Sequence, residues 1–359
     1  MNNPIRTAAI TLALILAALQ PLSLRAQATD NTNSAIIKSE FIVEAPPFPT
    51  SHASTIVETR DGLVAAWFGG SHEQAADVSI WLSRNDGHNW GPAEEVANGI
   101  DEKHARRDPC WNPVLFVRRN GDLMLFYKVG PSPSSWWGMY KVSENNGRTW
   151  SEPQKLPNGI IGPVRNKPLE LKDGTILCGS SIESEGWRVH MERFPDANGH
   201  WQRLRDLNSA MEYSAIQPTI LPWPDGRLQI LCRTKQGKIT DCWSGDNGMT
   251  WGRMMGTVLP NPNSAIDGLV LRDGPALLVY NHSTEDRNRL NVALSPDGRA
   301  WQAALVLEDS PGEYSYPAVI QTSDGLVHVT YSWKRERIKH VVFDPTKLSP
   351  KDMPDGRWP

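Results

Sequence analysis

The sequence predicts an all-β fold, a six-bladed β-propeller in which each blade contains four antiparallel strands. Two observations predict it: an Asx-Gly turn between apolar runs recurs about every fifty residues, and a turn ending in tryptophan recurs at the same interval. The composition agrees, because 28 Gly, 28 Pro and 15 Trp among 359 residues are typical of a turn-rich β protein.

The first repeated element is a hairpin. An Asx-Gly pair between two strand-like runs predicts a tight turn, because both residues accept a positive φ. The six turns begin at Asp61, Asn120, Asp173, Asp225, Asp273 and Asp324, so successive turns are 59, 53, 52, 48 and 51 residues apart. We expect each turn to join the first two strands of one blade.

The second repeated element is the turn S-x-D-x-G-x-x-W. Its copies end at Trp90, Trp150, Trp251 and Trp301, and the degenerate copy "RFPDANGHW" ends at Trp201. We interpret this turn as structural rather than ligand-binding, because Ser and Asp cap the backbone while Trp packs between strands. The sixth unit lacks it, so we expect the early run "SAIIKSEFIVE" to supply the last strand and close the ring.

The N-terminus is typical of a secretory signal. Arg6 precedes an apolar stretch too short to span a bilayer, and Ala26-Gln27-Ala28 offers a small-x-small cleavage site. We therefore expect residues 1–28 to be a signal peptide and residues 29–359 to be a single propeller domain, secreted or periplasmic, without a membrane anchor. Cys232 and Cys242 lie close enough in the pattern for a disulfide, but buried free thiols are an equal alternative.

Polar residues gather just before the first strand of each hairpin and just after the second. These positions meet at one edge of each blade, around the propeller axis, and predict a substrate-binding rim. The residues concerned are His52, Asn112, Lys128, Arg165, Lys167, Gln217, Arg233, Asp267, Asn281, His282, Tyr316 and Trp333. Clustered cations favour an anionic sugar, and aromatic residues such as Trp333 and Trp137 offer faces for a sugar ring.

Other classes of partner are not indicated. The formal charge of −3 does not indicate binding to nucleic acid. The sequence contains no phosphate-binding loop and no Cys or His residues at the spacing of a metal site. We therefore expect a glycan substrate, no cofactor and no metal.

The tryptophan turns resemble the Asp boxes of the sialidase superfamily, and the chain is similar to secreted sialidase-like proteins over residues 36–345. The resemblance implies that the catalytic tyrosine is Tyr316 and that the glutamate assisting it is replaced by Gln217. It also implies two arginines at Arg233 and, in preference to Arg289, Arg287. The family's first arginine falls on His52, and its acid/base aspartate falls in the loop that offers Glu73 and Asp77.

The preferred hypothesis is a hydrolase that removes a terminal acidic sugar. Tyr316 is then the nucleophile, Asp77 or Glu73 protonates the leaving oxygen, and Arg233 with Arg287 holds the substrate carboxylate. Gln217 cannot accept a proton, so Glu212, Glu183 or Glu313 is expected to activate Tyr316 instead.

Two alternatives remain open. In a polysaccharide lyase, His52 or His282 removes the proton next to a uronate carboxylate, and Tyr316 protonates the leaving oxygen. In a non-catalytic carbohydrate-binding propeller, the amide of Gln217 marks the loss of catalysis.

Overall fold

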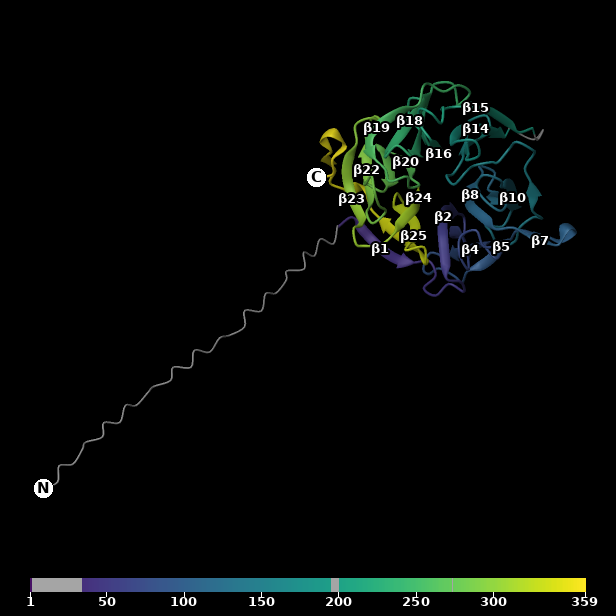
Figure 1. Ribbon diagram of the computed structural model, residues 1–359, viewed down its shortest axis with the longest axis horizontal. Helices are drawn as coiled ribbons and strands as arrows, with labels where there is room; N and C mark the ends of the chain where they lie inside the picture. Colours follow the sequence, from purple (N-terminus) through teal and green to yellow (C-terminus); the bar gives the residue numbers. More distant parts are fainter. Residues whose placement is uncertain (2–33, 195–199, 273) are drawn as a thin grey trace. The chain divides into compact units, whose positions relative to one another are not determined.

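Antiparallel sheets arranged around a central axis make up the computed structural model (Figure 1). The structure describes residue 1 and residues 34–194, 200–272 and 274–359. The six-bladed propeller is confirmed, with each blade built from consecutive strands. Nearly all of the predicted signal, part of the degenerate tryptophan turn at 195–199, and Asp273 lie outside the described residues.

Each blade runs in chain order from its inner strand to its outer strands. The first three blades are β2–β5 (Thr50–Thr59, Gly62–Gly70, Ser79–Asn85, Glu94–Ala97), β8–β11 (Cys110–Val117, Leu123–Val129, Trp137–Ser143, Gln154–Lys155) and β12–β15 (Leu169–Glu170, Ile176–Ile182, Arg188–Phe194, Gln202–Asp206). The fourth and fifth are β16–β19 (Ala215–Pro222, Leu228–Thr234, Lys238–Ser244, Met255–Pro260) and β20–β23 (Asp267–Val270, Ala276–Tyr280, Leu290–Ser295, Gln302–Glu308).

The sixth blade closes the ring by combining both ends of the described fold. It contains β24 (Tyr314–Gln321), β25 (Val327–Trp333) and β26 (Arg337–Phe343), and β1 (Ile36–Phe41) pairs antiparallel with β26. The expected closing strand is therefore confirmed.

Several short strands and 3-10 helices lie outside the four-stranded blades. β6 (Ile100–Asp101) and β7 (Arg106–Arg107) form a small hairpin around η1 (Glu102–His104), and β27 (Lys351–Asp352) extends the fifth blade between η2 (Pro345–Lys347) and η3 (Pro354–Gly356). Among the residues that the structure describes, no helix has the length and apolar character needed to cross a membrane.

In the turns at Gly62, Gly121, Gly174, Gly226 and Gly325 the glycine has the positive φ that the sequence predicts, but the Asx residue before it does not. Gly226 and Gly325 have φ of 87° and 91°, where a side chain is strained. In the tryptophan turn of the fourth blade, Ser244 Oγ accepts from Gly248 N at 3.0 Å and Asp246 Oδ1 accepts from Thr250 N at 2.9 Å. Trp251 is buried. All four cysteines are buried free thiols, so Cys232 and Cys242 do not form a disulfide in this structure.

A β-bulge in the inner strand sets up the site in several blades. It places one residue in the left-handed region eight positions before the Asx-Gly turn. The residues are Ala53 (φ 53°), Asn112 (37°), Gln217 (57°) and Tyr316 (55°), and the strand register shifts at each of them. In the last three the next residue is proline, which is tolerated at a bulge because a ladder hydrogen bond is already missing there. Arg165 stands at the same spacing, with φ of 75°.

Candidate active site

Tyr316 lies at the centre of a group of arginines. Its hydroxyl oxygen accepts a hydrogen bond from Arg233 Nη1 at 2.9 Å. The guanidinium carbons of Arg165, Arg233 and Arg287 lie 5.6, 5.7 and 5.9 Å from the centre of its ring. Burial raises the pKa of Tyr316, but the charges of Arg233 and Arg287 outweigh burial and leave the pKa below its ordinary value.

Gln217 shares the hydrogen bonding of Arg233. Its Oε1 accepts from the same Nη1 at 3.2 Å, and its backbone is held by Ser181 and Asn166. A neutral amide therefore occupies the position where the superfamily resemblance implies a carboxylate. Among the described residues, no carboxylate hydrogen-bonds to the Tyr316 hydroxyl.

His52 packs against the ring of the same tyrosine, with the two ring planes tilted by 50°. The two ring centres are 4.2 Å apart, and neither ring nitrogen of His52 has a hydrogen-bond partner within the described part of the chain. Burial, followed by the charges of Arg335 and Arg287, lowers the pKa of His52 well below its ordinary value. The imidazole is therefore neutral, and no carboxylate clamp can be built from it.

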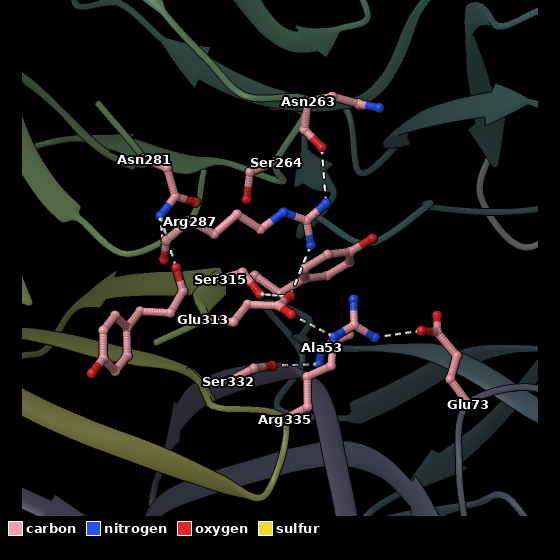
Figure 2. A network of polar contacts seen from close by, with 12 residues as sticks. Ala53, Glu73, Asn263, Ser264, Asn281, Arg287, Glu313, Ser315, Ser332 and Arg335 are labelled. Atoms are coloured by element: carbon pink, nitrogen blue, oxygen red, sulfur yellow. Dashed lines mark hydrogen bonds and ion pairs between the residues drawn. The ribbon is translucent and has the colours of Figure 1, made fainter. Parts of the chain in front are cut away.

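Glu313 joins two of the arginines (Figure 2). Its Oε1 accepts from Arg287 Nη1 at 3.0 Å and its Oε2 accepts from Arg335 Nε at 2.9 Å. Ser315 Oγ donates to Oε1 at 3.0 Å. Burial raises the pKa of Glu313, but Arg335 and Arg287 together lower it below its ordinary value, so the group is a carboxylate at neutral pH. Glu313 thus positions two guanidinium groups rather than activating Tyr316.

Arg335 is a site residue that the sequence analysis missed. It lies in the turn between β25 and β26, where Lys334 and Arg335 both have positive φ of 54° and 59°. Its carbonyl oxygen accepts from Ser51 N at 2.8 Å, and its guanidinium also pairs with Glu73. The basic run "KRER" is typical of an exposed turn, and only the contact of Arg335 with β2 indicates that Arg335 belongs to the site.

The bulge at Ala53 lies against the end of β25 that leads to Arg335. Ala53 is the counterpart of Gln217 and Tyr316 by its bulge and its spacing, but it carries no long side chain. Ser332 Oγ accepts from Ala53 N at 3.0 Å, which fixes the end of β25 against the bulge, and Figure 2 shows Arg335 beside it. The sixth blade thereby supplies a cation beside the first blade, whereas the resemblance aligned the family's first arginine with His52.

Three predicted rim residues tie blades together instead of facing open space. Arg165 is buried and donates to the carbonyl oxygens of Ile266 and Pro317, and burial lowers its pKa to about 10. Lys167 Nζ lies 2.8 Å from Asp267 Oδ2, and Asp267 is itself buried. These groups support the centre of the propeller beneath Tyr316.

Lys128 and two asparagines occupy different surroundings. Lys128 is fully buried, donates to the Pro163 carbonyl, and has its pKa lowered by burial to about 7. Asn281 Nδ2 donates to the carbonyl oxygens of Arg289 and Tyr314 at 2.7 and 2.8 Å, which holds the loop that carries Arg287. The side chain of Asn112 has no hydrogen bond within the described residues.

His282 and Trp333 are not brought together with the arginines. His282 Nδ1 lies 2.6 Å from the Tyr280 hydroxyl, and the ring lines a separate cavity of about 220 Å³ beside Trp358. Burial lowers the pKa of His282 to about 4. Trp333 packs edge-on against Phe41, with ring centres 5.3 Å apart.

The carboxylates near the site differ in what they can do. Both oxygens of Asp77 accept from Ser71, at 3.0 and 2.8 Å, and these bonds outweigh burial and lower its pKa. Glu73 is paired with Arg335, and exposed Glu212 with Arg253. Burial, opposed by Arg233 and Lys235, raises the pKa of Glu183, so Glu183 is the carboxyl best suited to donate a proton.

Comparison with known proteins agrees with this architecture. The model of the BNR repeat-like domain family matches residues 61–329, so the chain belongs to this family. No curated protein matches the sequence.

Solved structures extend the comparison to the whole propeller. A protein of unknown function from Dyadobacter fermentans superposes with a TM-score of 0.72 at 15% identity, covering 86% of this chain and 98% of its own. The intramolecular trans-sialidase from Ruminococcus gnavus gives 0.71 at 14%, covering 89% and 100%. The NanB sialidase from Streptococcus pneumoniae (K499G mutant) gives 0.68 at 12%, covering 88% and 71%. The expected resemblance to the sialidase superfamily is confirmed at the level of fold.

Proposed function

We propose that the protein is a glycoside hydrolase that removes a terminal acidic sugar, a sialic acid or a uronic acid, from a glycan. The observation that supports this most is the Tyr316 hydroxyl, which accepts a hydrogen bond from Arg233 inside a group of further arginines. A phenol paired with an arginine carries no net charge even as phenolate, so it approaches an anionic anomeric centre with less repulsion than a carboxylate experiences, and sialidases use a tyrosine nucleophile.

The reaction proceeds in two steps. Tyr316 Oη forms a bond to the anomeric carbon while the glycosidic carbon–oxygen bond breaks, and a carboxylic acid gives its proton to the leaving oxygen. Water then attacks the anomeric carbon and gives a proton back to that carboxylate, the bond to Tyr316 breaks with the phenolate leaving, and the free sugar departs. Glu73 and Asp77 are the acids that the superfamily resemblance suggests, and Glu183 joins them because burial favours its protonated form.

Arg233 takes over the task of the missing glutamate. A carboxylate at position 217 would pair with Arg233 and cancel its charge, whereas the amide of Gln217 leaves that charge acting on Tyr316. The lowered pKa of Tyr316 then makes loss of its proton to solvent easier, by electrostatic stabilisation rather than by proton transfer to a carboxylate base.

The substrate carboxylate is held by Arg233, Arg287 and Arg335. Glu313 fixes the last two, while Nη2 of Arg233 and of Arg335 makes no hydrogen bond within the described residues and remains to bind a ligand. Guanidinium–carboxylate pairs of this kind are strong and directional.

β-Elimination is a second candidate, favoured by one observation. His52 is neutral, lacks a hydrogen-bond partner in the described structure, and packs against the ring of Tyr316, so a base and an acid lie side by side. Its low pKa makes it a weak base, which is why hydrolysis is preferred.

The test is a panel of sialosides and uronate-capped oligosaccharides, followed by reducing-end release and by the ultraviolet absorbance of unsaturated uronates. New reducing ends without absorbance support hydrolysis, and a rise in both signals means elimination. Silence in both, with binding retained in calorimetry, would identify a carbohydrate-binding propeller and overturn the proposal.

The N-terminal sequence also supports the proposal that the protein is exported. N-terminal sequencing of the protein from the extracellular or periplasmic fraction is expected to begin at Thr29. Recovery from the cytoplasm with an intact N-terminus would contradict export.

A further inference from the structure

Two adjoining cavities lie outside the group of arginines. The larger, about 800 Å³, is lined by strands β5, β10 and β11 of the first two blades and by the β6–β7 hairpin. This hairpin projects from the outer edge of the propeller in Figure 1. The smaller, about 380 Å³, lies between the second and third blades. Trp137 and Lys155 line both cavities, so the two cavities adjoin at these residues. Their volumes lie in the range of small-molecule and oligosaccharide sites.

The smaller cavity includes one carboxyl group that interacts electrostatically with the group of arginines. Glu183 is part of its lining, and the charges of Arg233 and Glu73 act on Glu183. Trp187 bonds to Glu183, and its ring centre lies 5.3 Å from the guanidinium carbon of Arg233. Glu183 and Trp187 therefore connect the lining of the smaller cavity to Arg233, which donates to Tyr316.

Trp137 lies where the two cavities adjoin and offers a platform for a sugar ring. It packs against the core cluster of the first two blades but remains partly exposed. Lys155 Nζ lies 5.0 Å from its ring centre, and Lys155 has no ion-pair partner within the described residues. Arg106 lies on the same ring at 5.6 Å. An anchored indole flanked by hydrogen-bond donors suits a pyranose, which has apolar faces and hydroxyl edges.

The wall of the larger cavity is fixed by its own contacts. Asp101 Oδ1 accepts from His104 N at 3.2 Å at the start of η1, and Lys141 Nζ donates to the Val96 carbonyl at 2.9 Å, joining the two blades. Three acids and three permanent cations line this cavity, namely Glu95, Asp101, Glu102, Arg106, Lys141 and Lys155. Because these charges cancel, a neutral chain fits the cavity better than a polyanion does.

We propose that the two cavities bind the neutral oligosaccharide chain to which the acidic sugar is attached, with one of its rings stacked on Trp137. The inference rests on the proposed function for the direction of the chain, because Tyr316 acts on the terminal sugar and Glu183, one of the candidate acids, lines the smaller cavity. It extends that function by assigning an extended glycan, rather than a single glycoside, as the substrate class.

The test measures binding without requiring hydrolysis. Saturation-transfer NMR is recorded with three neutral tetrasaccharides (lacto-N-tetraose, chitotetraose and cellotetraose) on the wild type, Trp137→Ala and Trp243→Ala. Trp243 is a matched control, because it too is partly exposed beneath cations, with Arg227 at 4.7 Å and Arg299 at 6.0 Å, but it lines neither cavity. Circular dichroism verifies that all three proteins are folded.

At least one tetrasaccharide is expected to bind the wild type and Trp243→Ala equally, and to bind Trp137→Ala about tenfold more weakly. Binding by none of the three, or equal binding to Trp137→Ala, overturns the inference. If binding depends on Trp137 but no acidic glycoside is ever cleaved, the inference stands and the proposed hydrolase activity fails, so the two failures are distinguishable.

Discussion

Arg233 and Tyr316 are joined by a hydrogen bond of 2.9 Å from the guanidinium Nη1 to the phenol oxygen, although they come from the fourth and the sixth blade. Both stand at a fixed distance of eight residues from an Asx-Gly turn, Arg233 after Asp225 and Tyr316 before Asp324. A permanent cation donating to a phenol stabilises the phenolate, and this bond is the basis of the proposed chemistry.

Removing the phenol oxygen tests its role as nucleophile. Tyr316→Phe is expected to lower kcat on an acidic glycoside by about a thousandfold or more, because no other described group occupies its place, while binding of the product sugar changes little. Steady-state kinetics and calorimetry measure the two quantities. Tyr314→Phe is the control, since its hydroxyl makes only a 3.5 Å contact with the Pro311 carbonyl. A loss of activity as large in the control would point to damage of the fold.

The charge of Arg233 is expected to set the pH dependence. If phenolate is the reactive form, kcat/KM rises as pH increases through the pKa of Tyr316, which Arg233 and Arg287 hold below its ordinary value despite burial. Both Arg233→Gln, which removes a cation, and Gln217→Glu, which adds an anion, raise that pKa and move the rise to higher pH. Ultraviolet titration of the phenol provides the independent measurement. A profile unchanged in both variants would contradict electrostatic activation.

The position of Arg335 leads to a rescue experiment. Arg335→Ala is expected to weaken binding of an acidic sugar by about 10- to 100-fold, the equivalent of one charged hydrogen bond of about 1.5–3 kcal/mol. Ala53→Arg in the same protein places a guanidinium on the adjacent bulge and is expected to restore part of the loss. Binding of the free acid is compared with that of its methyl ester. If the double variant binds the acidic sugar no more tightly than Arg335→Ala does, a side chain at position 53 does not reach the carboxylate-binding site.

Lys128 is expected to affect stability rather than binding. Burial lowers its folded pKa to about 7, so the unfolded chain binds one more proton between this pH and its unfolded pKa of about 10.4. Its contribution to the free energy of unfolding therefore rises with pH across that window, by at most about 1.4 kcal/mol per pH unit. Denaturant titrations of wild type and Lys128→Met at several pH values test this. Parallel pH dependences in the two proteins would rule it out.

The repeat predicted the blades because turn chemistry is local. Asx-Gly fixes positive φ within two residues, so spacing alone located the hairpins and the strand that closes the ring. The same spacing located Gln217, Arg233 and Tyr316, which the structure brings together.

The distance of a residue from an Asx-Gly turn did not predict its role where a loop determines what surrounds its side chain. Lys128 and Arg233 both stand eight residues after a turn, yet the loop containing Pro163 covers Lys128, while Arg233 reaches Tyr316. Arg335 was missed because its role depends on the contact of one turn with Ser51, far away in the sequence. Long-range contacts of this kind leave no periodic signal.

The most direct test of the account is to trap the glycosyl intermediate. The protein is incubated with a fluorinated sialosyl fluoride and with the corresponding uronosyl fluoride, which form a covalent intermediate faster than they release it. Peptide mass spectrometry then locates the sugar. The account predicts one sugar per chain, attached to the peptide that contains Tyr316 and absent from Tyr316→Phe. Turnover of acidic glycosides with the label on another residue, or with no label from either reagent, would contradict it.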